Sequence, residues 1–256
     1  MIQLKISEGV GKITLNRPDK YHSFIKEMAL QLQEALNKCK NNKNVRAILI
    51  TAKGKAFCAG QDLIEATDPN GPSLTQIVEE HYNPIITIIR NIEKPVVAAV
   101  NGVAAGAGAS IALCCDIVVA CESASFIQAF SKIGLIPDSG ATFFLPRIIG
   151  MQRATGLMMT AEPISAKEAI KIGMIYKLFT DDTFEIESWK LVTKLASMPT
   201  KGLALTKKLL NESYSNNLEE QLEKEKIYQT IAGKTNDYKE GTEAFLQKRK
   251  PNFKGE

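Results

Sequence analysis

Asp138 is an acidic residue whose sequence setting could support acid–base chemistry. It follows the apolar run IGLIP, residues 133–137, and placing a carboxyl group beside apolar side chains raises its pKa. A raised pKa suits proton transfer near neutral pH. Pro-Asp-Ser-Gly is also favourable turn chemistry, so Asp138 or Ser139 could instead cap the helix predicted by ATFFLPRIIG, residues 141–150. This segment alone leaves both interpretations open.

Two glycine-containing loops could supply backbone donors to the same site. The first is GKAFCAGQDL, residues 54–63, where a strand ends and Gly60 lets the backbone turn closely past a ligand. The second is NGVAAGAGAS, residues 101–110, where glycine alternates with alanine before an apolar run. The first N–H groups of a helix lack internal partners, and the helix dipole there favours developing negative charge. Close packing of a helix against a sheet would require the same small residues.

Several other kinds of site do not fit the sequence. The P-loop pattern GxxxxGK[ST] is absent, and GVAAGAG has the wrong spacing for the dinucleotide fingerprint GxGxxG. His22 and His81 are the only histidines, and without a GxSxG motif they do not indicate a Ser-His-Asp hydrolase. No cluster of metal ligands is evident, so we expect no metal site. What remains is two donor loops and one carboxylate, a set suited to stabilising a thioester enolate while a proton moves.

The composition indicates a cytoplasmic protein with no membrane or nucleic-acid partner. The chain has 256 residues, 45% of them hydrophobic, and its net charge of +4 comes from interspersed basic and acidic residues. The longest apolar stretch is broken by Asn101, several glycines and Asp116, so it is not a membrane span, and we expect no signal peptide. The cysteines show neither metal nor disulfide spacing, which fits buried free thiols in a reducing compartment; they are Cys39, Cys58, Cys114, Cys115 and Cys121.

The hydrophobic pattern predicts an α/β core over residues 1–182 and a helical region over 183–256. In the core it predicts two strands within 2–15, a helix over 25–40, a strand in 45–54, a helical stretch over 75–92, and two buried parallel strands that bracket a tightly packed helix, in 95–102 and 115–123. Strand-like segments vanish after about residue 183, and four segments with helical periodicity follow. This helical region could pack on a neighbouring subunit.

Six segments together make the chain resemble the crotonase (enoyl-CoA hydratase/isomerase) superfamily over nearly its whole length. They are LNRPDKYHSF, AFCAGQDL, KPVVAAVNGVAAGAGASIALCCDIVVA, GLIPDSGATFFLPRIIG, ISAKEAIKIGMI and EGTEAFLQKRKPNFKGE. Within the superfamily, FCAGQDL, NGVAAGAGA and FSKIGLIPDSGATFFLPR are most similar to the ring-1,2-epoxyphenylacetyl-CoA isomerases of phenylacetate catabolism. The resemblance implies a crotonase-like spiral of ββα units, a C-terminal helical trimerisation region, and a homotrimer or a hexamer made of two trimers.

The resemblance also implies roles for particular residues. The backbone N–H groups of Gln61 and Ala107 would form the oxyanion hole, and Asp138 occupies the position of the catalytic acid of certain isomerases and dehalogenases. Hydratases of the superfamily use two glutamates, and the matching positions here are Ser110 and Phe130. A dehalogenase would need a Trp in place of Phe130 and a His in place of Asn83. With both hydratase acids missing, the sequence favours the catalytic interpretation of Asp138 over the helix cap.

The substrate would be an acyl-CoA thioester, and no separate cofactor is expected because coenzyme A is part of the substrate. Phe245 and Lys248 are spaced for one helix face, and the matching family positions contact the CoA nucleotide, often across a subunit boundary. The other positions expected to bind substrate are Lys20, His22, Ala59, Gly60, Asp62, Leu63, Gly106, Ser110 and Phe130.

The leading hypothesis is therefore an acyl-CoA isomerase. Asp138 would take a proton from carbon 2 and return it at carbon 4, or the same site would rearrange a ring epoxide to an oxepin. Two alternatives stay open: an enoyl-CoA hydratase of fatty-acid β-oxidation, and a non-catalytic homologue that binds acyl-CoA or RNA.

Overall fold

The computed structural model describes residues 1–256 and has two β-sheets. The strands are β1 (Ile2–Ser7), β2 (Val10–Leu15), β3 (Ala47–Ala52), β4 (Ala56–Cys58), β5 (Val96–Val100), β6 (Val103–Ala105), β7 (Ile117–Cys121), β8 (Ser125–Ile127), β9 (Ile164–Ser165) and β10 (Lys177–Phe179).

Helical segments connect and cover these strands. They are η1 (Pro18–Lys20), α1 (Lys26–Asn41), α2 (Leu63–Ala66), α3 (Leu74–Gln76), η2 (Ile77–Tyr82), α4 (Asn83–Asn91), α5 (Ala107–Leu113), η3 (Ala129–Ile133), α6 (Ala141–Ile149), α7 (Met151–Thr160), α8 (Ala166–Lys171), α9 (Phe184–Ala196), α10 (Thr200–Glu212), α11 (Leu218–Ala232) and α12 (Asn236–Leu246).

The larger sheet has the strand order β1-β2-β3-β5-β7-β10. Strands β1 and β2 form the predicted hairpin, which turns at Glu8 and Gly9 with positive φ angles of 52° and 75°. The remaining neighbours pair in parallel. Every residue of β3 and β5 is buried, as their continuous runs of apolar residues predict.

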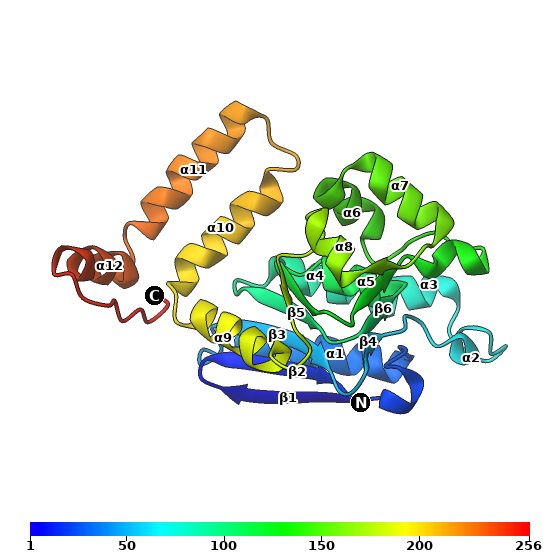
Figure 1. Cartoon of the computed structure of the whole chain (residues 1–256). Helices are drawn as coiled ribbons and strands as arrows, with labels where there is room; N and C mark the ends of the chain where they lie inside the picture. Colours follow the sequence, from blue (N-terminus) through cyan, green and yellow to red (C-terminus); the bar gives the residue numbers. More distant parts are fainter.

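The smaller sheet has the order β4-β6-β8-β9, and it reveals the repeat of the fold. In the successive pairs β3–β4, β5–β6 and β7–β8, the first strand joins the larger sheet and the second joins the smaller one, and a helical segment follows. This is the ββα spiral that the sequence predicted (Figure 1). Strands β4, β6 and β8 run parallel, so their carboxyl ends lie at the same edge of the sheet.

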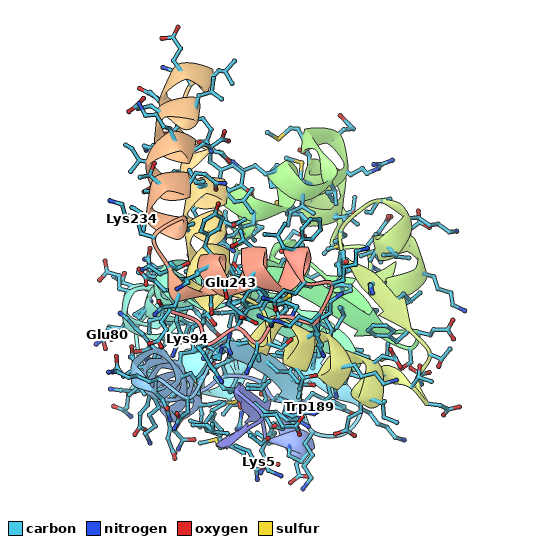
Figure 2. All side chains as sticks on the ribbon, turned by 90° about the vertical axis from the view of Figure 1, so that its left-hand side faces the viewer. Lys5, Glu80, Lys94, Trp189, Lys234 and Glu243 are labelled. Atoms are coloured by element: carbon cyan, nitrogen blue, oxygen red, sulfur yellow. The ribbon has the colours of Figure 1, made fainter.

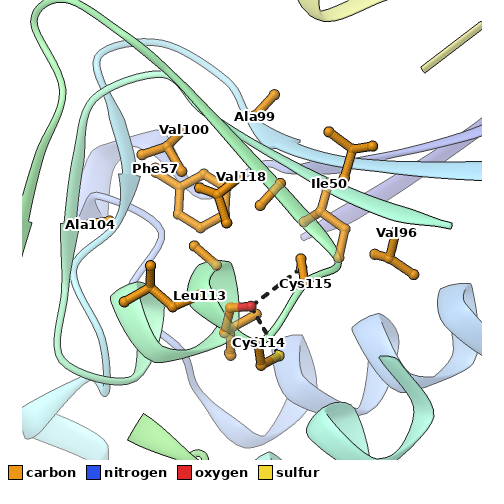
Figure 3. Packing of buried hydrophobic residues seen from close by; sticks show 14 of the residues in the cluster. Ile50, Phe57, Val96, Ala99, Val100, Ala104, Leu113, Cys114, Cys115 and Val118 are labelled. Atoms are coloured by element: carbon orange, nitrogen blue, oxygen red, sulfur yellow. Dashed lines mark hydrogen bonds between the residues drawn. The ribbon is translucent and has the colours of Figure 1, made fainter. Parts of the chain in front are cut away.

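The hydrophobic core includes side chains of both sheets and of helices α1, α4, α5 and α9, and Figure 3 shows the part around α5. Side chains of both sheets and of α5 meet there, among them Ile50, Phe57, Val96, Val100, Leu113 and Val118. All five cysteines are buried free thiols, as expected. The Cys114 and Cys115 thiols both donate to the Ile111 carbonyl, which satisfies them inside the core.

The predicted helical stretch over 75–92 is helical but not uniform. It comprises the short α3, the π-helical turn η2 and the α-helix α4, with Pro84 in the first turn of α4. The Asn83 N–H donates to the Val78 carbonyl five residues earlier, which closes the wide turn just before the proline. Proline lacks an N–H donor, so placing it at the start of a helix costs little stability.

No strand follows β10, and four helices, α9 to α12, complete the chain as predicted. Helices α10, α11 and α12 extend away from the sheets (Figure 1). A partly buried ion-pair network ties α10 to the core: Lys207 Nζ lies 2.8 Å from Asp116 Oδ2, and Arg90 Nη1 lies 3.2 Å from Asp116 Oδ1. Charges of both signs, such as Lys5, Glu80, Lys234 and Glu243, cover the exterior (Figure 2). None of the helices has the length and apolar character needed to cross a membrane.

Two helical glycines provide a matched test of packing. A Cβ built on Gly108 of α5 would lie 2.6 Å from both the Cβ and the carbonyl oxygen of Cys58, whereas a Cβ on Gly156 of α7 would meet nothing within 4 Å. We expect Gly108→Ala to lower the free energy of unfolding by about 1–3 kcal/mol through overpacking. Gly156→Ala should raise it by up to about 1 kcal/mol through helix propensity. Urea denaturation of both variants measures this, and equal effects would contradict the packing role of Gly108.

Candidate active site

The loops after β4 and β6 bring two backbone segments into contact. Gly60 and Gly106 both have positive φ angles, 92° and 50°, which glycine adopts without strain. A Cβ on Gly60 would lie 3.1 Å from the Ala105 carbonyl oxygen and 3.6 Å from the Ala107 nitrogen. A larger residue at position 60 would therefore push the two loops apart.

Each loop presents one main-chain N–H group that has no acceptor in the protein. The Gln61 N–H makes no hydrogen bond, although the flanking groups do: the Phe24 N–H donates to the Gly60 carbonyl, and the Asp62 N–H donates to the Phe24 carbonyl. Ala107 begins α5, so its N–H has no partner within the helix. The two predicted oxyanion donors are thus in adjacent loops and free to bind an oxygen atom.

Asp138 lies half-buried in the turn before α6, and it does not cap that helix. The cap position belongs to Gly140 and no side chain accepts a hydrogen bond there, so the capping interpretation of Asp138 or Ser139 is wrong. Asp138 Oδ1 instead accepts a hydrogen bond of 2.9 Å from Ser139 Oγ. Burial raises the pKa of the Asp138 carboxyl, and this hydrogen bond offsets part of the rise.

The apolar run before Asp138 does not surround the carboxyl group as the sequence suggested. Ile133 and Leu135 are partly exposed, and Ile136 is 82% exposed. The run therefore forms an open apolar surface next to the carboxylate, rather than a closed wall around it. Ser139 and Gly140 follow with positive φ angles of 52° and 74°, and this pair of left-handed residues turns the chain into α6.

Tyr82 contacts the first donor loop, and the sequence analysis did not single it out. Its side chain is 1% exposed, and its hydroxyl donates to Gln61 Oε1 at 2.7 Å. Burial raises the pKa of Tyr82 well above its usual value, and the negative charges of neighbouring groups, Asp138 among them, raise it further. Tyr82 therefore lies within electrostatic range of Asp138 and in contact with Gln61. The sequence offered no clear signal for Tyr82, because its neighbours Glu80, His81 and Asn83 are polar as well.

The two positions that match the hydratase glutamates carry no acid and have other tasks. Ser110 is 1% exposed, and its Oγ donates to the Gly106 carbonyl within the first turn of α5. Phe130 is buried beside the same loop, with Cζ 3.9 Å from a Cβ built on Gly106. Neither side chain can activate a water molecule as a carboxylate does.

Two further predicted binding residues hold the local structure with their side chains. The His22 ring accepts from the Arg17 N–H at Nδ1 and contacts the Lys53 carbonyl at 2.7 Å through Nε2. The Asp62 carboxylate accepts from Arg17 Nη1 at 2.7 Å and from the Ile64 N–H that begins α2. Burial disfavours the charged carboxylate and would raise the pKa of Asp62. The hydrogen bonds have the larger combined effect, so its pKa is lowered.

The remaining predicted positions near the loops are accessible to a ligand. Lys20 ends η1, and the Ala59 N–H donates to the Tyr21 carbonyl, so the η1 segment adjoins the first donor loop. Lys20, Ala59 and Leu63 are exposed. Nowhere do three or more His, Cys, Asp or Glu side chains form an arrangement that could hold a metal ion.

Phe245 and Lys248 are not brought to this site within one chain. Helix α12 lies on the opposite side of the molecule from α2 and α3 (Figure 1). The expectation that both residues share a helix face is wrong, because α12 ends at Leu246 and Lys248 has a positive φ of 54°. Both side chains are exposed, Phe245 to 83%.

Comparison with known proteins agrees with this geometry. The family model described as Enoyl-CoA hydratase/isomerase matches residues 5–256. The chain is 46% identical to the 1,2-epoxyphenylacetyl-CoA isomerase of Escherichia coli (strain K12), over 98% of this chain and 97% of that protein. It is 42% identical to a "Probable enoyl-CoA hydratase" of Rhodobacter capsulatus, over 99% of this chain and 98% of that protein.

Solved structures show the same fold. An enoyl-CoA hydratase from Bacillus anthracis superposes with a TM-score of 0.92 at 33% identity, covering 100% of this chain and 99% of that one. The chain belongs to the enoyl-CoA hydratase/isomerase family and has the crotonase fold. Isomerases and hydratases both occur among its relatives, so family membership alone does not specify the reaction.

The pKa of Asp138 predicts how pH affects stability. Its folded-state pKa lies above its unfolded value, so between the two values the folded chain binds more protons and stability falls as pH rises. Above both values the full cost of the buried charge is present. We expect Asp138→Asn to raise the melting temperature at pH 8, with the difference shrinking toward pH 4. Thermal unfolding across this range tests it, with the exposed Asp182→Asn as the control. A constant difference would contradict the assigned pKa shift.

Proposed function

We propose that this protein is an acyl-CoA isomerase with Asp138 as its single acid–base group. One observation carries the proposal: Asp138 is a half-buried carboxyl with a raised pKa, while Ser110 and Phe130, beside the loop that presents the free Ala107 N–H, supply no second acid. A single carboxylate is sufficient to move a proton between two carbons on one face of a substrate. Hydration would require activation of water as well.

The proposed mechanism begins with the thioester oxygen accepting hydrogen bonds from the N–H groups of Gln61 and Ala107. The Asp138 carboxylate removes a proton from carbon 2 of a 3-enoyl thioester, and the developing enolate charge rests on the oxygen in the donor loops. Protonated Asp138 then returns the proton at carbon 4, which leaves a 2-enoyl product. Coenzyme A takes part as a portion of the substrate, and no other cofactor enters these steps.

Rearrangement of an aromatic ring epoxide is the second isomerisation that this site could perform. Its support is the 46% identity to the 1,2-epoxyphenylacetyl-CoA isomerase of Escherichia coli. In that reaction the same two N–H groups would polarise the thioester. The hydratase alternative is supported by the name of the Rhodobacter relative, and the side chains at positions 110 and 130 argue against it.

We further propose that the protein works in the cytoplasm as a homotrimer or as a hexamer of two trimers. Its five free thiols fit a reducing compartment. The C-terminal helices leave apolar side chains uncovered and flank a groove of about 730 Å³ between α10 and α11, as a surface for another subunit would. The exposed apolar residues of these helices are Leu210, Leu218, Leu222, Ile227, Ile231, Phe245 and Leu246.

Turnover of a panel of CoA thioesters tests the reaction. We expect the wild type to convert a 3-enoyl-CoA, an epoxyphenylacetyl-CoA or both, and to hydrate crotonyl-CoA weakly or not at all. Asp138→Asn should lower kcat by about 10²–10⁴-fold, the usual value of general acid–base catalysis, while thioester binding is retained. The exposed Asp182→Asn serves as the matched control. Isomerisation within threefold of wild type in Asp138→Asn, or efficient hydration by the wild type, would refute the proposal.

We propose that Lys248, from its exposed position beyond α12, binds the phosphates of the CoA held by a neighbouring subunit. An ammonium group near a phosphate makes a charge-assisted contact that salt screens when it is exposed. We expect Lys248→Ala to raise KM several-fold at low salt and less at high salt, with kcat little changed. Lys239→Ala, which removes an exposed charge within α12, should leave KM unchanged. An unaltered KM in Lys248→Ala at all salt concentrations would show that Lys248 does not hold the CoA.

A further inference from the structure

Tyr82 owes its orientation to the π-helical turn η2. This turn closes hydrogen bonds over five residues rather than four, so it inserts one extra residue before α4. Without that residue, the side chain at position 82 would be rotated by about 100° around the helix axis. The ring is 1% exposed and packs edge-on against Phe24, with 5.8 Å between ring centroids.

The Tyr82 hydroxyl starts a directed chain of hydrogen bonds. Tyr82 donates to Gln61 Oε1 at 2.7 Å, and Gln61 Nε2 donates to Glu65 Oε2 at 3.1 Å. A carboxylate only accepts, and the phenol has one proton to give, so the Gln61 amide is held in one orientation. The Glu65 carboxylate in turn accepts from the Lys26 N–H at 3.0 Å, which anchors the chain to the start of α1.

The same residue, Gln61, is also fixed through its main chain. The peptide groups on either side of it exchange hydrogen bonds with Phe24, at 2.6 Å and 2.8 Å. The side-chain bonds to Tyr82 and Glu65 are added to these. The Gln61 N–H is left without a hydrogen-bond partner. The bonds made by the neighbouring peptide groups and by the Gln61 side chain hold this donor in a fixed direction.

We propose that Tyr82 is a positioning residue, which acts through the Gln61 side chain to hold the Gln61 N–H toward the thioester oxygen. This inference rests on the proposed role of that N–H as an oxyanion donor. A tyrosine that merely filled the core would be replaced by phenylalanine with a cost in stability alone. A positioning tyrosine would lose transition-state stabilisation, because misplaced donors reduce kcat rather than substrate binding.

A double-mutant cycle separates these roles. We expect Tyr82→Phe to lower kcat about tenfold or more, with KM within twofold of wild type. In the Gln61→Leu background, which keeps the N–H but removes the amide, Tyr82→Phe should change kcat less than twofold. Tyr228→Phe is the matched control, because the Tyr228 hydroxyl donates to Glu212 at 3.1 Å within the C-terminal helices. Additive losses in the cycle would overturn the inference.

A spectroscopic readout keeps the test independent of turnover. Hydrogen bonds to a thioester carbonyl lower its infrared stretching frequency, so benzoyl-CoA bound to the wild type should show a larger downshift than benzoyl-CoA bound to Tyr82→Phe. Equal shifts would overturn the inference even if the enzyme proved to be a hydratase. If the wild type shifts the band more than Tyr82→Phe does but isomerises no thioester, the proposed function fails and the role of Tyr82 stands. If the wild type isomerises, and Tyr82→Phe changes only the melting temperature, Tyr82 is structural.

Discussion

The site depends on the parallel hydrogen-bonded pairing of β4, β6 and β8. Parallel strands of one sheet end at the same edge, so the loops that follow them must meet. The strands themselves are three residues long, and they can be short because their partners in the larger sheet carry most of the burial. Glycine at positions 60 and 106 then allows the loop backbones to approach within contact distance.

Burial and exposure divide the site into a rigid part and an open part. The free N–H groups of Gln61 and Ala107 belong to backbone whose neighbouring peptide groups are hydrogen-bonded, so their orientation is fixed before any ligand binds. The carboxylate of Asp138 is half-buried, next to an apolar surface formed by Ile133, Leu135 and Ile136. A bound acyl chain or another subunit that covers this surface would remove water from the carboxylate and strengthen it as a base.

Much of the fold could be predicted from the sequence because the hydrophobic pattern of each segment agrees with its position in the folded structure. Buried apolar runs became the central strands β3 and β5, and small residues around Gly108 became a helix packed against β4. The resemblance to a family added the spiral of ββα units, which no local pattern encodes, and the division of the strands between two sheets came from the structure. The free N–H groups of Gln61 and Ala107 were predicted at the positions where the structure leaves donors unpaired.

Other features could not be predicted because they depend on contacts distant in sequence. The π-helical turn before Pro84 places Tyr82 against Gln61, and helical periodicity does not distinguish such a turn from an α-helix. The end of α12 at Leu246 removes Lys248 from the helix face that its spacing indicated, since an element boundary is set by a few backbone hydrogen bonds. The Asp138 turn was ambiguous because Pro-Asp-Ser-Gly suits either a turn or a helix cap, and the structure resolves it by placing Gly140 at the cap position with no side-chain cap bond.

The alternation of strands between two sheets has an evolutionary consequence. The larger sheet supplies the buried scaffold, while the smaller sheet ends in loops that present main-chain donors. Positions 110, 130 and 138 lie on separate segments, and a substitution at any of them leaves the main-chain N–H groups of Gln61 and Ala107 present in the chain. Point substitutions could therefore change which thioester reaction a family member catalyses, while the folded backbone stays the same.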